Sequence, residues 1–597
     1  RTVAVAFDRP AFSLIYYPDG SLTSYVGSKR NPVANALYEK NNTDRFSIQF
    51  SNSVQYKITK TLFFTTTFNA MLDTRQNLFF SPRYVSANKD QNNGSNDVQK
   101  TFSWEYQSFF NYSKTFNGAH SLSAVLGVSA DKRRYDRAHS EYSNVVSEEI
   151  FITQPSYLTA SRTYTDADRS AGASLFARGN YSYKGKYTLA GILRRDGSSR
   201  FGNESRYGNF YSASGGWRFS DEPFMAWAKR ALTDGRFRIG VGQVGNDRIG
   251  SNDYLNKITF TGGNYAGVGG AYTTPTFGNG RVHWETTIQQ NAGLDLTFFR
   301  GRLTFTADYY IKTTKDLLYQ RDLPGETGFD NVKINLGTIE NRGIEFSVKG
   351  TPILAKGDNR GLTWDVGGNI SFERSIIKKL GDGTPFIVAN KWYIEEGGKI
   401  GNFFGWRNLG VYQWNESNAY NDNWEQLTVV LGDNGKPLYE NGSPVYTFNG
   451  QRYTGAVHNM YDPAGKLLGG DVIWENVSKD SLIDDRDRQV LANAQPKFYL
   501  GLFNNLTYRQ FSLSFLFNAS FGSHVYNALL WAQSYPTATG AGSPEMVYNV
   551  WRKQGDIAKY PYYPDFKSRG NEKKDANSIF IEDGSFIRLS SLRLSYT

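Results

Sequence analysis

Apolar and polar side chains alternate with a period of two along much of the chain. The segment 511–521 (FSLSFLFNASF) places Phe, Leu and Ala on one parity and mainly Ser and Asn on the other. Because successive side chains of a strand point to opposite faces, this pattern predicts strands whose two faces meet different media. Alternation of this kind predicts roughly fifteen strands, near residues 46–58, 61–71, 101–113, 120–130, 171–183, 187–195, 209–219, 235–243, 287–299, 302–312, 339–350, 362–373, 497–508, 511–521 and 586–596.

The predicted strands and their connections favour a membrane barrel. At about 9 to 13 residues, the strands are close to the length that crosses a bilayer when tilted. Short links, such as 59–60, 184–186 and 509–510, alternate with long ones near 72–100, 131–170, 244–286, 374–496 and 522–585. Tight turns at one end and long loops at the other are typical of outer-membrane barrels. We therefore expect an all-β fold, a transmembrane antiparallel β-barrel with long extracellular loops; the alternative is a soluble sandwich or propeller.

Composition narrows the function classes further. The 597 residues include 92 aromatic residues, four Met and no Cys, which excludes disulfide frameworks, thiol nucleophiles and cysteine zinc sites. No run of 18 apolar residues offers a transmembrane helix. The net charge is +11, and the basic residues are scattered along the chain. This distribution argues against a nucleic-acid partner and favours basic residues that contact lipopolysaccharide or line a lumen. The start at Arg1, without a leader sequence, predicts a processed chain or a fragment.

Catalytic and cofactor motifs are weak throughout. Residues 240–245 (GVGQVG) match a dinucleotide fingerprint, but they end a predicted strand and no helical pattern follows, so structural glycines are the preferred interpretation. The five histidines lack metal-site spacing, and no GxSxG motif occurs. We therefore predict no enzyme and no organic cofactor.

One loop is a candidate calcium site. In residues 476–487 (NVSKDSLIDDRD), an EF-hand-like spacing would take oxygen ligands from Asn476, Ser478, Asp480 and Asp487. Ser481 replaces the usual glycine, and Asp487 replaces the bidentate Glu. The alternative is a loop held by hydrogen bonds without calcium.

Several blocks, in order, resemble the SusC-like (RagA/SusC) TonB-dependent outer-membrane transporters of Bacteroidetes. They are residues 193–202 (LRRDGSSRFG), 216–224 (GWRFSDEPF), 242–246 (GQVGN), 284–287 (WETT), 339–345 (IENRGIE), 551–556 (WRKQGD) and 582–589 (EDGSFIRL). The resemblance runs over nearly the whole chain. The loop at 476–487 is similar to a family block with more acidic residues and glycines, from which this chain departs.

The resemblance implies a barrel of about 22 strands, of which roughly fifteen lie in residues 1–597. It also implies a plug domain, a segment pulled by the TonB-ExbB-ExbD complex and a SusD-like lipoprotein lid. Neither the plug nor the TonB segment is recognisable here, and an open sheet edge is costly in lipid. We therefore expect the plug, the first strands and the last strands to lie outside this chain.

These observations predict active import of glycans or oligopeptides across the bacterial outer membrane, together with a SusD-like lid. The alternative is an anchoring or docking subunit of a larger surface or secretion assembly, and a soluble carbohydrate-active enzyme is a third class. Outer-membrane lipid and lipopolysaccharide are expected partners, and a homodimer of barrels is a candidate assembly. Trp406, Tyr412 and Trp414 are candidate substrate-stacking residues, with packing inside the loops as the alternative.

Overall fold

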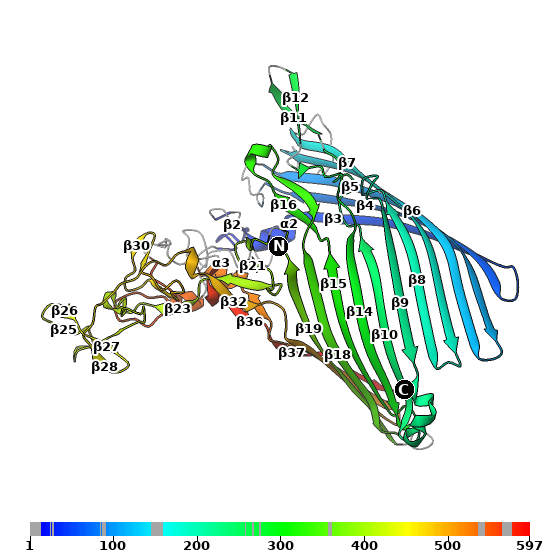
Figure 1. Cartoon of the computed structure of the whole chain (residues 1–597). Helices are drawn as coiled ribbons and strands as arrows, with labels where there is room; N and C mark the ends of the chain where they lie inside the picture. Colours follow the sequence, from blue (N-terminus) through cyan, green and yellow to red (C-terminus); the bar gives the residue numbers. More distant parts are fainter. Residues whose placement is uncertain are drawn as a thin grey trace.

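A computed structural model describes residues 14–23, 25–26, 29–83, 85, 91–144, 159–256, 258–265, 268–273, 276–355, 361–381, 383–534, 544–563 and 576–596. Among these residues, no helix is both long enough and apolar enough to span a membrane. Strands dominate the architecture (Figure 1).

Fifteen antiparallel strands form one large sheet, and each strand pairs with its neighbours in chain order. All fifteen coincide with segments predicted from the alternation, so the prediction of an all-β fold is confirmed. β3 and β37 form the two edges of the sheet. The strands are β3 (Lys40–Lys57), β4 (Leu62–Ser81), β5 (Asn93–Phe116), β6 (His120–Ser143), β7 (Thr159–Tyr183), β8 (Tyr187–Ser198), β9 (Tyr207–Trp217), β10 (Leu232–Asn246), β14 (Glu285–Phe298), β15 (Leu303–Lys315), β18 (Thr338–Ile353), β19 (Leu362–Lys379), β33 (Phe498–Tyr508), β34 (Phe511–Phe521) and β37 (Phe586–Tyr596).

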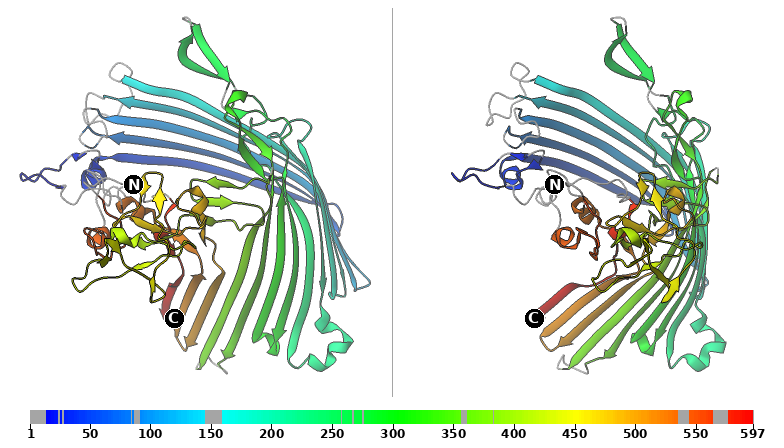
Figure 2. Two further views of the ribbon diagram at one scale, coloured as in Figure 1. Left: turned by 60° about the vertical axis from the view of Figure 1, so that its left-hand side comes forward. Right: turned by 90° about the vertical axis from the view of Figure 1, so that its left-hand side faces the viewer.

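The sheet is a single curved layer (Figure 2). The alternation along its strands gives this layer one apolar and one polar face. Register keeps the faces continuous from strand to strand: Leu126 of β6 is opposite Ala177 of β7, which is opposite Leu193 of β8. Leu126 and Leu193 remain 56% and 66% exposed, so no second layer of the described chain covers them. The alternative of a two-layer sandwich is therefore wrong, and the apolar face is left for lipid.

Short links join the strands at one end of the sheet, which we call the turn end. Strands β5 and β6 are joined through Asn117 and Gly118, and β7 and β8 through Lys184 and Gly185, with positive φ at all four residues. Two successive residues with positive φ form the tight turn whose twist suits a β-hairpin, and Asn and Gly adopt this conformation readily.

The opposite, loop end differs from the prediction at two connections. The expected loops 72–100 and 131–170 are mostly strand, because β4 and β5 leave only residues 82–92 between them and β6 and β7 leave only 144–158. The extensions of β5, β6 and β7 carry mainly polar side chains on both faces, so the apolar alternation stops there although the backbone ladder continues. The loops expected at 244–286, 374–496 and 522–585 match the observed connections 247–284, 380–497 and 522–585.

Small elements occupy the connections and the N-terminal part of the chain. Helices are short: α2 (Pro32–Tyr38), α3 (Ala528–Gln533) and α4 (Pro544–Asn549), with 3-10 turns η2 (Phe219–Asp221), η3 (Pro223–Ala228), η4 (Phe299–Gly301), η5 (Gly325–Thr327), η6 (Asn415–Ser417), η7 (Asp485–Asp487) and η10 (Ser578–Phe580). The minor strands are β1 (Tyr25–Val26), β2 (Lys29–Arg30), β11 (Ile258–Tyr265), β12 (Val268–Thr273), β13 (Thr276–Phe277), β16 (Leu318–Asp322), β17 (Asn331–Asn335), β20 (Phe386–Val388), β21 (Trp392–Ile394), β22 (Asn402–Gly405), β23 (Asn408–Val411), β24 (Thr428–Val429), β25 (Tyr439–Glu440), β26 (Ser443–Pro444), β27 (Tyr446–Phe448), β28 (Gln451–Tyr453), β29 (Tyr461–Asp462), β30 (Gly465–Lys466), β31 (Val472–Trp474), β32 (Gln489–Asn493), β35 (His524–Tyr526) and β36 (Ile581–Asp583).

Residues 386–493, together with 544–563 and 576–583, form a body of loops that we call the loop domain. It lies beside the loop ends of β19, β33 and β37 (Figure 1). Its largest core cluster contains buried Trp474, Met460, Leu467, Val472 and Ile483. A compact core of this kind makes the long connection a folded domain of its own.

Candidate functional site

The polar face of the sheet carries ion pairs that link neighbouring strands. Arg238 of β10 donates to Asp295 of β14 at 2.7 and 3.1 Å and to Asp308 of β15 at 2.9 Å. All three side chains are roughly one-third exposed. Charged groups that remain partly hydrated while balancing one another are suited to the wall of a water-filled passage.

A second cluster of charged side chains lies on the polar face, in the extensions of β5 and β6 toward the loop end. Asp97 accepts from Arg137 Nε at 2.7 Å and pairs with His139 Nδ1 at 2.9 Å. The other ring nitrogen of His139 lies 3.1 Å from Glu141. This network holds the polar strand extensions together where no apolar face contributes.

An apolar cavity of about 510 Å³ lies at the loop end, between the β16–β17 hairpin and the β20–β21 hairpin. Ile339 and Ile377, opposite each other on β18 and β19, belong to the parity that faces the lumen. Arg321 and Lys379 add positive charge to the lining. The cavity is lined further by Leu317, Leu318, Leu336, Phe386, Val388, Ile394 and Ile400.

The aromatic candidates lie inside the loop domain. Trp406 is 9% exposed, donates from Nε1 to the Asp484 carbonyl at 2.9 Å and stacks under the Arg488 guanidinium at 4.8 Å. Tyr412 is 1% exposed. Trp414 is half-buried, and a Cβ at Gly555 would lie 2.7 Å from its ring. These positions favour the packing interpretation over stacking on a substrate.

The hydroxyl of Tyr412 forms a 2.6 Å hydrogen bond with the hydroxyl of Tyr420. Burial raises the pKa of Tyr420 to about 12 and raises that of Tyr412 as well. Both phenols therefore stay protonated at neutral pH, and the pair serves as a neutral link within the core rather than as an acid or base.

The four calcium candidates lie close together, but their oxygens face protein donors. Asp487 is fully buried and accepts from the backbone N–H groups of Val477 and Ser478, both at 3.0 Å, and from Asp484 N–H at 2.9 Å. The Ser478 hydroxyl donates to the same carboxylate at 2.9 Å. Its acceptor capacity is thus occupied by the loop itself.

A guanidinium occupies the part of this loop where further carboxylates converge. Arg486 contacts Asp480 at 2.9 Å and Asp484 at 2.8 Å, while the side-chain amide of Asn476 donates to the Asp480 carbonyl at 2.7 Å. Across the described residues, no three His, Asp or Glu side chains are grouped to hold a metal ion. The residues present therefore do not fit a calcium ion.

The glycine motif at 240–245 lies within strand β10 and does not precede a helix. A Cβ at Gly245 would lie 2.1 Å from Phe210 Cζ and 2.8 Å from the Trp284 ring. Close packing against aromatic rings therefore explains this glycine, as the sequence predicts.

Sequence reasoning missed the apolar cavity and the Arg238 network. Asp308 lies in the predicted strand 302–312, but nothing in the spacing of the sequence joins it to Arg238, 70 residues earlier. Register between β10, β14 and β15 supplies that link.

Comparison with known proteins identifies the family. Residues 5–434 match the model described as TonB dependent receptor-like, beta-barrel. TonB-dependent receptor P39 of Formosa agariphila is 33% identical over 603 residues, covering 99% of this chain and 56% of that protein. TonB-dependent receptor SusC of Bacteroides thetaiotaomicron is 26% identical, covering 97% of this chain and 53% of that protein. The chain thus spans about half the length of these curated relatives.

Solved structures show the same fold. The RagAB peptide importer in its closed-closed state superposes with a TM-score of 0.76 at 19% identity, covering 99% of this chain and 60% of that one. Its open-open state gives a TM-score of 0.75. The sheet is therefore an outer-membrane β-barrel wall, with its apolar face toward lipid and its polar face toward the lumen. The chain belongs to the TonB-dependent receptor-like β-barrel family.

Proposed function

We propose that the whole protein imports oligopeptides or glycans across the outer membrane, energised through TonB and assisted by a SusD-like surface lipoprotein. The carrying observation is the polar, ion-paired face of the sheet, which ends in long loops and a folded loop domain on one side. Such import requires a water-filled passage through the barrel, covered on the outside by a lid such as the lipoprotein. The proposal includes no covalent chemistry by this chain.

The apolar cavity favours oligopeptides within this pair of substrate classes. Glycan sites rely on exposed aromatic faces, and Trp406 and Tyr412 are buried in the loop domain. By contrast, an aliphatic peptide side chain fits a cavity of about 510 Å³ lined by Leu, Ile and Phe. Arg321 and Lys379 add charge that attracts a peptide carboxylate. RagAB, which has the same fold, is named as a peptide importer, and this supports the same choice.

The test of the proposed function is uptake by whole cells. We expect cells that produce the protein to accumulate a fluorescent oligopeptide, and accumulation to stop when TonB or the neighbouring lipoprotein is deleted. Uptake of an oligosaccharide in place of the peptide would assign the glycan class. If the protein reaches the membrane and the cells accumulate neither the oligopeptide nor the oligosaccharide, the result would support the alternative function, a docking subunit of a larger assembly.

Ile394 provides a test of the cavity itself. Ile394→Asp places a carboxylate in the apolar lining, where desolvation is costly. We expect at least tenfold weaker binding of a leucine-rich oligopeptide to the purified whole protein, measured by isothermal titration calorimetry.

Ile387→Asp is the matched control. Ile387 belongs to the same β20–β21 hairpin but does not line the cavity, and it is 39% exposed. Unchanged binding by this variant, with the loss confined to Ile394→Asp, supports the peptide subsite. Equal effects of both substitutions would show that the hairpin fold matters and the cavity does not.

A further inference from the structure

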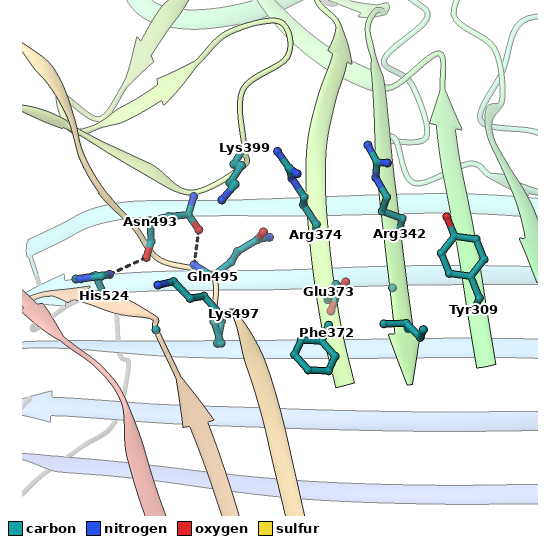
Figure 3. A pocket seen from close by; sticks show the side chains of 14 residues that line it. Tyr309, Arg342, Phe372, Glu373, Arg374, Lys399, Asn493, Gln495, Lys497 and His524 are labelled. Atoms are coloured by element: carbon teal, nitrogen blue, oxygen red, sulfur yellow. Dashed lines mark hydrogen bonds between the residues drawn. The ribbon is translucent and has the colours of Figure 1, made fainter. Parts of the chain in front are cut away.

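A hollow of about 450 Å³ opens on the lipid-facing side of β15, β18 and β19, in the half of these strands that leads to the loop end. Tyr309, Ile344 and Phe372 are cross-strand neighbours that form its apolar floor. Figure 3 shows these strands from outside, with strands of the opposite wall behind them and Glu373 on the far side of β19. The hollow therefore borders the upper limit of the apolar belt.

Two arginines face each other directly above this floor. Arg342 of β18 and Arg374 of β19 are register partners on the apolar parity (Figure 3). Like charges directly opposite in a sheet repel, so this arrangement lowers the stability of the sheet unless an anion joins the two groups. Arginine pairs are well suited to phosphate, whose oxygens accept two parallel hydrogen bonds from each guanidinium.

The protein supplies too few carboxylates to balance this cluster. Glu340 lies 3.3 Å from Arg342 and 3.8 Å from Lys378. Within the residues that the structure describes, Arg374 and Lys399 form no ion pair. A surplus of positive charge therefore remains beside an apolar floor.

The far wall of the hollow adds further polar groups. Lys497 and His524 line it, together with Asn493, whose carbonyl lies 3.3 Å from His524 Nδ1 (Figure 3). Asp583 of β36 is the register partner of His524 on β35, which places one carboxylate beside this wall. The unbalanced charge is thus concentrated on the β18–β19 side, where Arg374 meets Arg342.

The same arrangement recurs on another part of the wall. Arg134 of β6 and Arg169 of β7 are register partners on the lipid-facing parity. Lys132 lies on the same face, directly above an apolar run that ends at Ala130. Asp136 pairs with Arg134 at 2.7 Å, as Glu340 does with Arg342. Paired arginines at the upper edge of the apolar belt are therefore a repeated feature of the outer surface.

We propose that the hollow at Arg342 and Arg374 binds the phosphorylated headgroup of an outer-leaflet glycolipid of the lipid A type. The loop end of an outer-membrane barrel faces the cell exterior, so this height corresponds to the headgroups of the outer leaflet. The phosphate lies between the two guanidinium groups, and the acyl chains lie against Ile344 and Phe372. One ligand thus satisfies both the charge surplus and the apolar floor.

The test measures lipid A binding to the whole protein purified in non-ionic detergent. The variant is Arg342→Gln with Arg374→Gln. The control is Arg300→Gln with Arg509→Gln, which removes the same charge from links at the turn end. Binding is measured by displacement of fluorescent lipid A. The competing probes are lipid A, enzymatically dephosphorylated lipid A, phosphatidylglycerol and inorganic phosphate. Heat-modifiable migration in gels verifies that each variant is folded.

We expect the double variant to bind lipid A at least tenfold more weakly, and the control to match the unmodified protein. We also expect dephosphorylated lipid A to bind the unmodified protein at least tenfold more weakly than lipid A does. Equal binding by the double variant and the unmodified protein would overturn the proposal. Displacement by inorganic phosphate at the same concentration would assign a free-phosphate site, and equal displacement by phosphatidylglycerol would assign a general anionic-lipid surface; either result contradicts a glycolipid site.

Discussion

Leu126→Arg is expected to destabilise the folded barrel in membranes more than any other single substitution considered for β6. Leu126 lies in the middle of the apolar run of β6, three outward-facing positions before Lys132. Its cross-strand neighbours on the same lipid-facing side are Phe110 of β5 and Ala177 of β7. An arginine on the lipid face near the bilayer midplane costs about 2 to 4 kcal/mol. We expect the equilibrium constant for folding to fall by a factor of about 30 or more, measured by urea titration of the whole protein in lipid vesicles.

Val125→Arg separates the effect of the face from that of the residue type. Val125 is the adjacent aliphatic residue of β6, and its side chain belongs to the lumen-facing parity. We expect a loss of only about 1 kcal/mol or less there, because the charge remains hydrated. Equal destabilisation by the two substitutions would mean that both faces of β6 are buried in the same kind of medium.

Asp487→Ala is expected to unfold the loop region that contains residues 476–487. The Asp487 carboxylate accepts hydrogen bonds from the backbone N–H groups of Val477, Ser478 and Asp484, all within 3.0 Å. Leaving three buried donors unpaired costs on the order of 3 kcal/mol or more. We expect rapid cleavage of the loop domain by trypsin in the variant, while the barrel resists; timed proteolysis and mass spectrometry measure this.

The matched control is Asp485→Ala, two residues earlier, because the Asp485 side chain is 85% exposed and has only a 3.9 Å contact with Arg488. We expect its cleavage rate to stay close to that of the unmodified protein. A chelator is expected to leave the unmodified loop domain equally resistant, since Arg486 bridges Asp480 and Asp484 in place of a cation. Chelator-induced cleavage, reversed by calcium, would refute this account of the loop.

Strand positions were predictable because the bilayer imposes the pattern. Each strand that crosses lipid must alternate apolar and polar residues, and segments such as β34 (Phe511–Phe521) were located to the residue. The loop-end extensions of β5, β6 and β7 were missed because no lipid contacts them. There, residues such as Asp97, Arg137 and His139 support the ladder through side-chain bonds that have no periodic hydrophobic signal.

Candidate sites were predicted less well, because they depend on contacts between distant segments. For Trp406 and Tyr412 the sequence leaves two roles open, stacking on a substrate and packing inside the loops, and the buried positions of both residues favour packing. The pairing of Arg342 with Arg374 follows only from the register of β18 against β19. The apolar cavity likewise combines residues from four segments between positions 317 and 400. Sequence spacing alone contains none of these contacts.

Spin labels along β6 test the central claim most directly, and the absence of cysteine in this chain makes each introduced cysteine a unique attachment point within it. Labels would replace Ala124, Leu126 and Val128 on one parity and Ser123, Val125 and Ser129 on the other, one at a time, in the whole protein in vesicles. We predict high collision rates with oxygen for the first set and with a water-soluble nickel chelate for the second. Low rates for both reagents at all six positions, or no alternation, would contradict a barrel wall between lipid and a wet lumen.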